Sequence, residues 1–257
     1  MSGARRLEIV ALAGIPEVTE GARLGELIAA AATAAGRGIS DGDAVVVSQK
    51  VVSKAEGRIR RLAEVRPGER ARDLAAELGK DPRLVELVLG ESRRVVRAVG
   101  GVLIVETRAG WICANAGIDA SNVPGADAVA LLPVDADASA RRIRAEIEAS
   151  GGARPAVVVA DSFGRPWRIG QTDVAIGCAG LLALDDWRGR ADVQGRELTA
   201  TAIAVADGLA GAADLARDKG SASPAVLITG AEAWRVDEDG RGAGAALQRP
   251  PDEDLFR

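Results

Sequence analysis

Two short segments of the chain place carboxylates beside hydroxyl and amide groups at points where apolar, strand-like runs end. In the first, Asp119 is followed closely by Ser121 and Asn122. In the second, Asp161 and Ser162 come directly after a run of alanine and valine. Polar side chains at strand ends are held by a rigid scaffold and remain open to a ligand. We therefore expect both segments to contribute to one site.

The sequence contains no histidine, so the usual general base and every imidazole metal ligand are absent. Any metal must be held by oxygen, and the oxygens of Asp119, Asp161 and Ser162 suit Mn²⁺ or Mg²⁺. Cations near such an ion would neutralise charge on a transferring phosphoryl group, which is the main catalytic effect in that chemistry. The candidates for this role are Lys54, Arg165, Arg168 and Lys219.

These residues predict a metal-phosphate site in which Asp119, Asp161 and Lys54 carry the catalysis. The competing interpretation is structural: Asp119 caps a loop and Asp161 starts a turn. Lys50 and Lys54 lie one helical turn apart after a predicted strand, and this pair is also typical of a solvated helix face.

Other classes of function fit the composition poorly. Acids and bases are interspersed, with a net charge of -4, so a nucleic-acid partner is not expected. No run is long and apolar enough for a membrane helix and no signal peptide is visible, which predicts a cytoplasmic protein with no membrane partner. Cys113 and Cys178 are expected to be buried free thiols. A Walker loop is absent, and the glycines of residues 240–244 are expected to form a flexible turn.

Segments of strand and helix character follow one another without one regular alternation. Strands are expected at residues 7–12, 44–48, 95–99, 102–106, 111–114, 156–160 and 225–228, and helices at 24–35, 67–79, 82–89, 138–149 and 197–216. The run at 44–48 is nearly pure valine, as in a strand covered on both faces. The pattern favours an α+β (mixed α/β) fold with mixed sheets and packed helices. No linker or repeat divides it, so residues 1–257 are expected to form a single domain.

Six blocks of sequence, in this order, resemble the coenzyme F420-0:L-glutamate (γ-glutamyl) ligase family. They are residues 14–17 (GIPE), 48–58 (SQKVVSKAEGR), 106–108 (ETR), 115–122 (NAGIDASN), 161–168 (DSFGRPWR) and 170–177 (GQTDVAIG). The resemblance covers nearly the whole chain. It implies a fold of two intertwined lobes and a homodimer, without the C-terminal nitroreductase-like domain that some members carry.

The resemblance also implies an activity. It predicts a GTP-dependent ligase of coenzyme F420 biosynthesis that joins L-glutamate to the lactyl carboxylate of coenzyme F420-0 through an acyl phosphate and then adds γ-linked glutamates. Mn²⁺ or Mg²⁺ would bridge the phosphates, and K⁺ is a further candidate ion. Two alternatives stay open: a nucleotide- and metal-dependent carboxylate-amine ligase with another acceptor, and a non-catalytic protein that binds a nucleotide-metal complex.

Carried over by motif, Asp119, Asp161 and Ser162 resemble the metal ligands of the family. The resemblance places the nucleotide contacts at Ile15, Pro16, Glu17, Val18, Gln49, Lys54, Asn122, Arg217, Lys219, Gly220 and Ser221. Three residues depart from the family pattern: Gln49, Lys219 and Ala109, the last standing where a histidine would be expected, with no consequence for the site. Gln49 stands where some relatives have a serine, which puts that contact in doubt. Lys219 stands where relatives carry a metal-ligating side chain, and because an ammonium group cannot ligate a metal, a lysine-phosphate contact is expected there instead.

Overall fold

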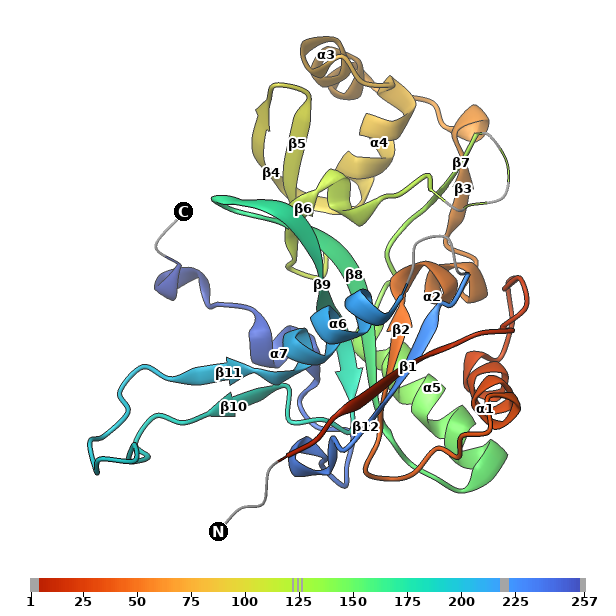
Figure 1. The fold of residues 1–257 in the computed structure, drawn as a ribbon. Coiled ribbons are helices and arrows are strands. Elements are labelled where there is room, and N and C mark those ends of the chain that lie inside the picture. The colour runs from red at the N-terminus through yellow and green to blue at the C-terminus, as the bar shows by residue number, and fades with distance from the viewer. Residues whose placement is uncertain (1–4, 122, 124, 126, 218–221, 255–257) are drawn as a thin grey trace.

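A five-stranded mixed sheet forms the centre of the computed structural model, which describes residues 5–121, 123, 125, 127–217 and 222–254 (Figure 1). The strands lie in the order β1-β12-β2-β8-β9. Only the central pair, β2 and β8, is parallel, and the other three pairs are antiparallel. The strands are β1 (Glu8–Leu12), β12 (Ala225–Thr229), β2 (Ala44–Ser48), β8 (Ala156–Arg165) and β9 (Arg168–Ala179).

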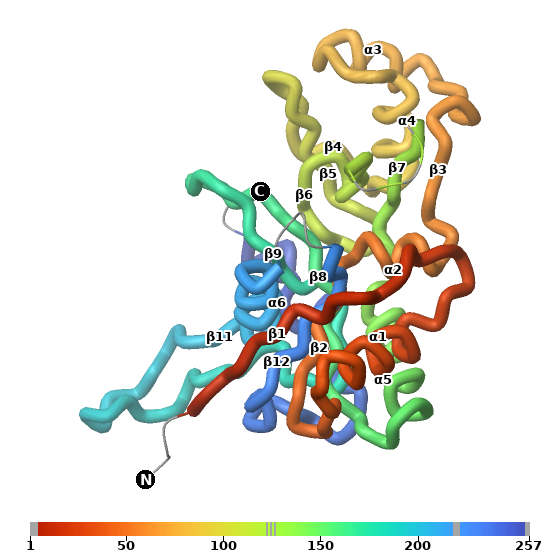
Figure 2. Tube along the Cα trace, turned by 45° about the vertical axis from the view of Figure 1, so that its right-hand side comes forward, coloured from red at the N-terminus to blue at the C-terminus, as the bar shows by residue number. Residues whose placement is uncertain are grey.

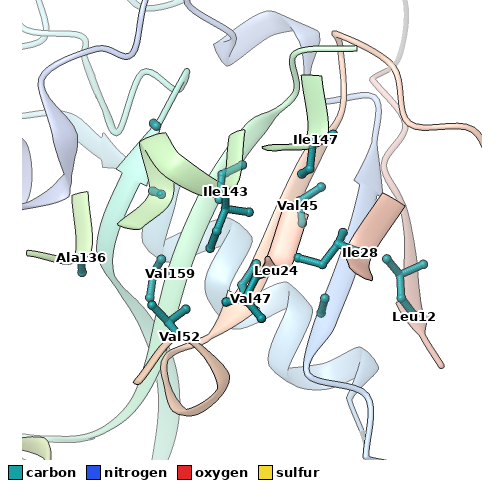
Figure 3. Packing of buried hydrophobic residues seen from close by; sticks show 14 of the residues in the cluster. Leu12, Leu24, Ile28, Val45, Val47, Val52, Ala136, Ile143, Ile147 and Val159 are labelled. Carbon is teal, nitrogen blue, oxygen red and sulfur yellow. The ribbon is translucent and has the colours of Figure 1, made fainter. Parts of the chain in front are cut away.

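Helices cover both faces of this sheet, and the alternation of small apolar residues along the strands explains why. Val45 and Val47 of β2 pack against α1 (Leu24–Ala34) and α5 (Ala136–Gly151), as Figure 3 shows. Val46, between them, faces the opposite core with α6 (Val205–Ala216) and α7 (Gly242–Leu247). All three valines are fully buried. The prediction that this strand is covered on both faces is confirmed.

A smaller lobe is inserted between β2 and β8 and lies above the central sheet in Figure 1. A short helix, α2 (Gln49–Ala55), leads into it from the end of β2. The lobe has its own core, centred on residues such as Leu103, Val105 and Leu131. Its elements are β3 (Ile59–Arg61), η1 (Leu62–Glu64), α3 (Glu69–Leu78), α4 (Pro82–Gly90), β4 (Ser92–Val99), β5 (Val102–Thr107), β6 (Ile112–Ala114), η2 (Asn115–Gly117) and β7 (Ala128–Ala130).

A two-stranded arm, formed by β10 (Leu184–Asp186) and β11 (Ala202–Ala204), projects from the body in both Figures 1 and 2. Val193, between its strands, is 98% exposed. The chain then passes through α6 and β12 to η3 (Glu232–Trp234), α7 and η4 (Pro251–Glu253). No helix among the described residues has both the length and the apolar character needed to cross a bilayer.

Two side chains of α5, the buried Arg144 and the half-buried Asp137, hold the carboxy-terminal segment against the body. Arg144, 1% exposed, donates hydrogen bonds to the backbone carbonyls of residues 155 and 236–238 and to Asp239 Oδ1. Asp137 accepts hydrogen bonds from the backbone N–H groups of Cys178, Ala243 and Gly244. Both side chains satisfy backbone groups that would otherwise be buried without partners.

The predicted α+β class with mixed sheets is confirmed, as are the buried free thiols Cys113 and Cys178. Three element predictions are wrong, two of them in the carboxy-terminal part of the chain. The helix expected at 197–216 begins only at Val205, because residues 202–204 pair as β11 with β10. The expected flexible turn at 240–244 is wrong as well, because its second half begins helix α7, whose first turn Asp137 caps.

The strand expected to end before Asp161 instead continues as β8 to Arg165 and pairs with β9 along its length. A register shift after Val159 marks a bulge in this pairing. Opposite it, Gly177 packs so closely on the first turn of α5 that an added Cβ would overlap the backbone carbonyl of Ala136. The small residues at 175–180 therefore serve both a bulge and a close backbone approach.

Candidate active site

Asp119 lies just beyond a sharp turn that follows β6. Asn115, Ala116 and Gly117 have φ angles of 50°, 55° and 69°, in the left-handed region that residues other than glycine rarely adopt. After this turn the backbone of Asp119 exchanges two hydrogen bonds with Ala130 of β7, at 3.1 and 2.8 Å. The backbone that carries the carboxylate is thus held by the core of the smaller lobe.

Lys50, in the first turn of α2, reaches across to Asp119 from the central sheet. Its Nζ lies 2.8 Å from Asp119 Oδ2 and 2.7 Å from Ser121 Oγ. Ser121 also donates to Asp119, through its backbone N–H at 2.7 Å and its hydroxyl at 2.9 Å. Burial raises the pKa of Asp119, but the hydrogen bonds from Lys50 and Ser121 outweigh it, so the pKa lies below the ordinary value. Asp119 is therefore held as a carboxylate.

Asp161 stands on β8 close to this cluster. Burial raises the pKa of its carboxyl group to about 7, and the charges of Asp173 and Asp119 add to the increase. The backbone N–H of Ser162 and the charge of Lys50 act in the opposite direction. Asp119 and Asp161 thus lie within electrostatic range of each other although they come from different lobes. A cation between them would remove the cost of their mutual repulsion.

Ser162, next along β8, belongs to a second chain of contacts. Its hydroxyl donates a hydrogen bond of 2.6 Å to Asp173 Oδ1 on β9, and Arg217, just after α6, forms an ion pair with Asp173 Oδ2. Because the hydroxyl proton is directed at Asp173, the oxygen lone pairs of Ser162 remain available as acceptors. Arg217 is thereby anchored beside the predicted metal ligands.

Lys54 lies one turn after Lys50 on α2 and is almost fully buried. Its Nζ forms an ion pair of 2.6 Å with Oε1 of Glu17, whose side chain is largely exposed. Glu17 belongs to the turn after β1 in which Ile15 and Val18 pack against the main core. The structure therefore brings the predicted nucleotide turn and the predicted phosphate-binding lysine into contact.

Not every predicted site residue faces this cluster. Gln49 is 1% exposed, and its amide nitrogen donates to Ser53 Oγ and to the carbonyl oxygen of Leu131, so its side chain is directed into the interior in this structure. Arg165 and Arg168 are exposed at the turn of the β8–β9 hairpin, beyond the acids. The predicted contacts Asn122, Lys219, Gly220 and Ser221 lie outside the described residues.

The chemistry of the donor set fits a hard divalent cation. No group of three His, Cys, Asp or Glu side chains among the described residues is arranged to enclose a metal ion. Mg²⁺ is usually bound by only one or two carboxylates and completes its shell with water and substrate phosphates. Asp119, Asp161 and the hydroxyl oxygen of Ser162 match that pattern better than a closed structural site.

Lys50 and Asp173 are the members of this cluster that were not predicted from the sequence. The lysine pair at 50 and 54 is typical of a solvated helix face, and Asp119, the partner of Lys50, is distant along the chain. Asp173 carried one signal, since it is an acid within one of the motif blocks. Its contacts with Ser162 and Arg217 depend on the β8–β9 pairing and on the end of α6.

Comparison with known proteins adds a family to this geometry. The model of the F420-0:gamma-glutamyl ligase family matches residues 14–230. The chain is 41% identical to the coenzyme F420:L-glutamate ligase of Methanothermobacter thermautotrophicus, over 98% of this chain and 99% of the relative. It is 42% identical to the enzyme of that name from Haloarcula marismortui, over 98% and 96% of the two chains. For the one from Methanocaldococcus jannaschii the identity is 40%, over 85% and 86%.

The match covers nearly the whole chain, and each of these relatives is named as a ligase. The chain belongs to the F420-0:gamma-glutamyl ligase family. The resemblance found in the six sequence blocks is thereby confirmed.

Proposed function

We propose that this protein is a GTP-dependent ligase that adds L-glutamate to coenzyme F420-0 and then extends the product with γ-linked glutamates. The observation that carries the proposal is the full-length likeness to coenzyme F420:L-glutamate ligases. It is supported by the convergence of Asp119, Asp161 and Lys50, with Lys54 one helical turn after Lys50. The acceptor carboxylate, the nucleotide and the amine are all small, polar molecules, in keeping with such a site.

The residues divide into two roles. Asp119 and Asp161, with Ser162, would hold Mn²⁺ or Mg²⁺, which supplies charge neutralisation for the phosphates. Lys54 would exchange Glu17 for a nucleotide phosphate, because the lysine is buried and its present partner is an exposed, displaceable carboxylate. Arg217, fixed by Asp173 beside Ser162, would help to orient the nucleotide.

The proposed reaction is a phosphoryl transfer followed by an acyl transfer, with no change of oxidation state. An oxygen of the acceptor carboxylate attacks the γ-phosphorus of GTP, the bond to the β-phosphate oxygen breaks, and GDP leaves. The α-ammonium group of glutamate loses one proton to water, and the neutral amine then attacks the acyl carbon of the acyl phosphate. The carbon-oxygen bond breaks and inorganic phosphate leaves. The nitrogen loses a second proton to water as the amide forms. Positioning and charge neutralisation supply most of the catalysis in this type of phosphoryl transfer.

The test is to mix purified protein, GTP and Mn²⁺ with or without L-glutamate and with or without coenzyme F420-0. We expect sustained GDP formation and glutamylated product only when both substrates are present, and at most one GDP per active site with coenzyme F420-0 alone. ATP in place of GTP, and other carboxylates or amino acids in place of each substrate, define the specificity. GDP formation with another acceptor would assign a related ligase activity, and nucleotide binding without turnover under every condition would leave only a binding protein.

We also propose that the protein acts as a homodimer in the cytoplasm. The β10–β11 arm supports the dimer, because an isolated two-stranded sheet is marginally stable in water and this one carries the exposed Val193 and Ile203. The buried free thiols are in keeping with a reducing compartment. Light scattering should give twice the chain mass, and replacing the arm's 187–201 segment by a short turn should give the monomer mass.

A further inference from the structure

The ammonium group of Lys50 lies beside Asp119, where the proposed function would place a divalent metal ion. Its side chain is 17% exposed, and its Nζ contacts Asp119 Oδ2 and Ser121 Oγ at hydrogen-bond distance. Its charge also acts on Asp161. The ammonium group therefore lies between the two lobes, against a carboxylate of the proposed metal site, and neutralises part of the negative charge there.

An ammonium group and a divalent cation compete at this carboxylate. Both bind Asp119 as a cation binds an anion, and Oδ2 already accepts hydrogen bonds from Lys50 and from the Ser121 hydroxyl. A metal ion bonded to the same carboxylate would place its two positive charges within a few ångströms of Nζ, where the repulsion is strong in a partly buried site. Lys50 must therefore move when the metal enters, or the metal binds weakly.

We propose that Lys50 is an internal counter-cation, which keeps divalent metal from binding tightly to the empty site and makes metal binding depend on the nucleotide. The inference rests on the proposed function, since it needs a nucleotide-metal site at Asp119 and Asp161. When a triphosphate arrives, its negative charge offers the ammonium group a new partner. Lys50 then leaves Asp119 for a phosphate oxygen, and the metal takes its place.

The position of Lys50 on α2 would let its ammonium group move from Asp119 to a phosphate bound near Lys54. Lys54, one turn further along the same helix, is the lysine expected to bind phosphate. Both ammonium groups are thus carried by one short helix at the end of β2, and each is paired with a single carboxylate from another segment. Rotation of the flexible lysine side chain can redirect its charge toward phosphate without moving the backbone.

The test measures Mn²⁺ affinity by the electron paramagnetic resonance signal of the free ion, with and without a non-hydrolysable GTP analogue. For the wild type we expect weak binding of Mn²⁺ alone and binding at least 100-fold tighter with the analogue, roughly the upper range of typical coupling between two ligands. For Lys50→Met we expect at least tenfold tighter binding of Mn²⁺ alone. The nucleotide-dependent gain should fall by at least the same factor.

Three further variants distinguish loss of the Lys50 charge from a folding defect and from a change in net charge. Lys50→Gln also removes the positive charge but keeps a polar side chain, so it can be measured if Lys50→Met does not fold. Lys50→Arg keeps the positive charge. The GTP analogue should therefore increase its Mn²⁺ affinity by at least half as many logarithmic units as in the wild type. Lys80→Met removes a lysine of the smaller lobe, so it controls for net charge and should behave as the wild type.

The outcomes distinguish the inference from the function on which it rests. Equal Mn²⁺ affinity of the wild type and both neutral Lys50 variants in the absence of nucleotide would overturn the counter-cation role and leave the ligase function standing. Failure of the wild type to bind Mn²⁺ even with the GTP analogue would instead overturn the nucleotide-metal site itself. Weaker Mn²⁺ binding in Lys50→Met would show that the lysine organises the site rather than competing for it, which also refutes the inference.

Discussion

Replacement of Asp161 by asparagine should stabilise the metal-free protein while it abolishes turnover. The pKa of this carboxyl group is raised from 3.8 to about 7 in the folded protein. Because each pKa unit corresponds to about 1.4 kcal/mol, a charged Asp161 lowers the free energy of unfolding by up to about 4 kcal/mol, and partial access to water reduces this to about 2 to 4 kcal/mol. The asparagine side chain carries no charge and avoids this cost.

The sign of the pH dependence follows from the same shift. The folded protein binds the Asp161 proton more tightly than the unfolded chain, so the associated stability is fully present below about pH 4 and is lost as the pH rises through about 7. The stability of Asp161→Asn does not fall in this way as the pH rises, because asparagine has no carboxyl proton to lose. We therefore expect its advantage over the wild type to grow by about 2 kcal/mol between pH 5 and pH 8.

The assay is urea unfolding with a chelator at both pH values, with Glu64→Gln as the control because that acid is exposed on the smaller lobe. In separate titrations without chelator and with a non-hydrolysable GTP analogue present throughout, added Mn²⁺ should stabilise the wild type at pH 8 and have little effect on Asp161→Asn. If the asparagine variant is no more stable than the wild type at pH 8, Asp161 does not lie in the desolvated, acid-rich environment on which the site depends.

Three other substitutions test the positioning of the site. Arg144→Met should lower the free energy of unfolding by about 2 to 3 kcal/mol in urea titrations, because it leaves the carbonyl groups of residues 155 and 236–238 without their donor, while Asp239 keeps Arg154 as a partner; a change below about 1 kcal/mol would contradict the proposed anchoring. Gly177→Ala should cost about 3 kcal/mol through its clash with α5, whereas Gly208→Ala, which meets open space in α6, should be neutral or stabilising in the same titration. Lys54→Met should weaken binding of a fluorescent GTP analogue at least tenfold with little loss of stability, and unchanged affinity would exclude a phosphate contact.

The central sheet could be predicted because its signals are local. The valines of β2 are buried on both faces, and a continuous apolar run is what that environment selects. Asp81 caps α4 ahead of Pro82, as the capping rules lead one to expect. In these segments the local sequence already indicates the structure that the distant contacts complete.

The failures occur where distant segments decide the structure. Residues 202–204 have the composition of a helix, but they pair with β10 before α6 begins. Gly164 and Arg165 have little strand preference and are held in β8 by pairing with β9. In such cases tertiary pairing overrides local propensity.

The candidate site was predicted in part for the same reason. Asp119, Asp161 and Ser162 could be selected because acids and hydroxyls after apolar runs are recognisable in the sequence itself. The importance of Lys50 became visible only when the smaller lobe placed Asp119 and Ser121 against α2. Gln49, chosen by motif alone, is instead directed into the interior.

The insertion of the smaller lobe between β2 and β8 has a consequence for the order of folding. These two strands pair in parallel although they are more than a hundred residues apart, so their union closes a long loop and is entropically costly. The lobe has a separate core of its own and can collapse earlier. Lys50, Asp119 and Asp161 come from the two ends and the middle of this loop, so ligand binding during refolding would report the closure of the chain and not its initial collapse.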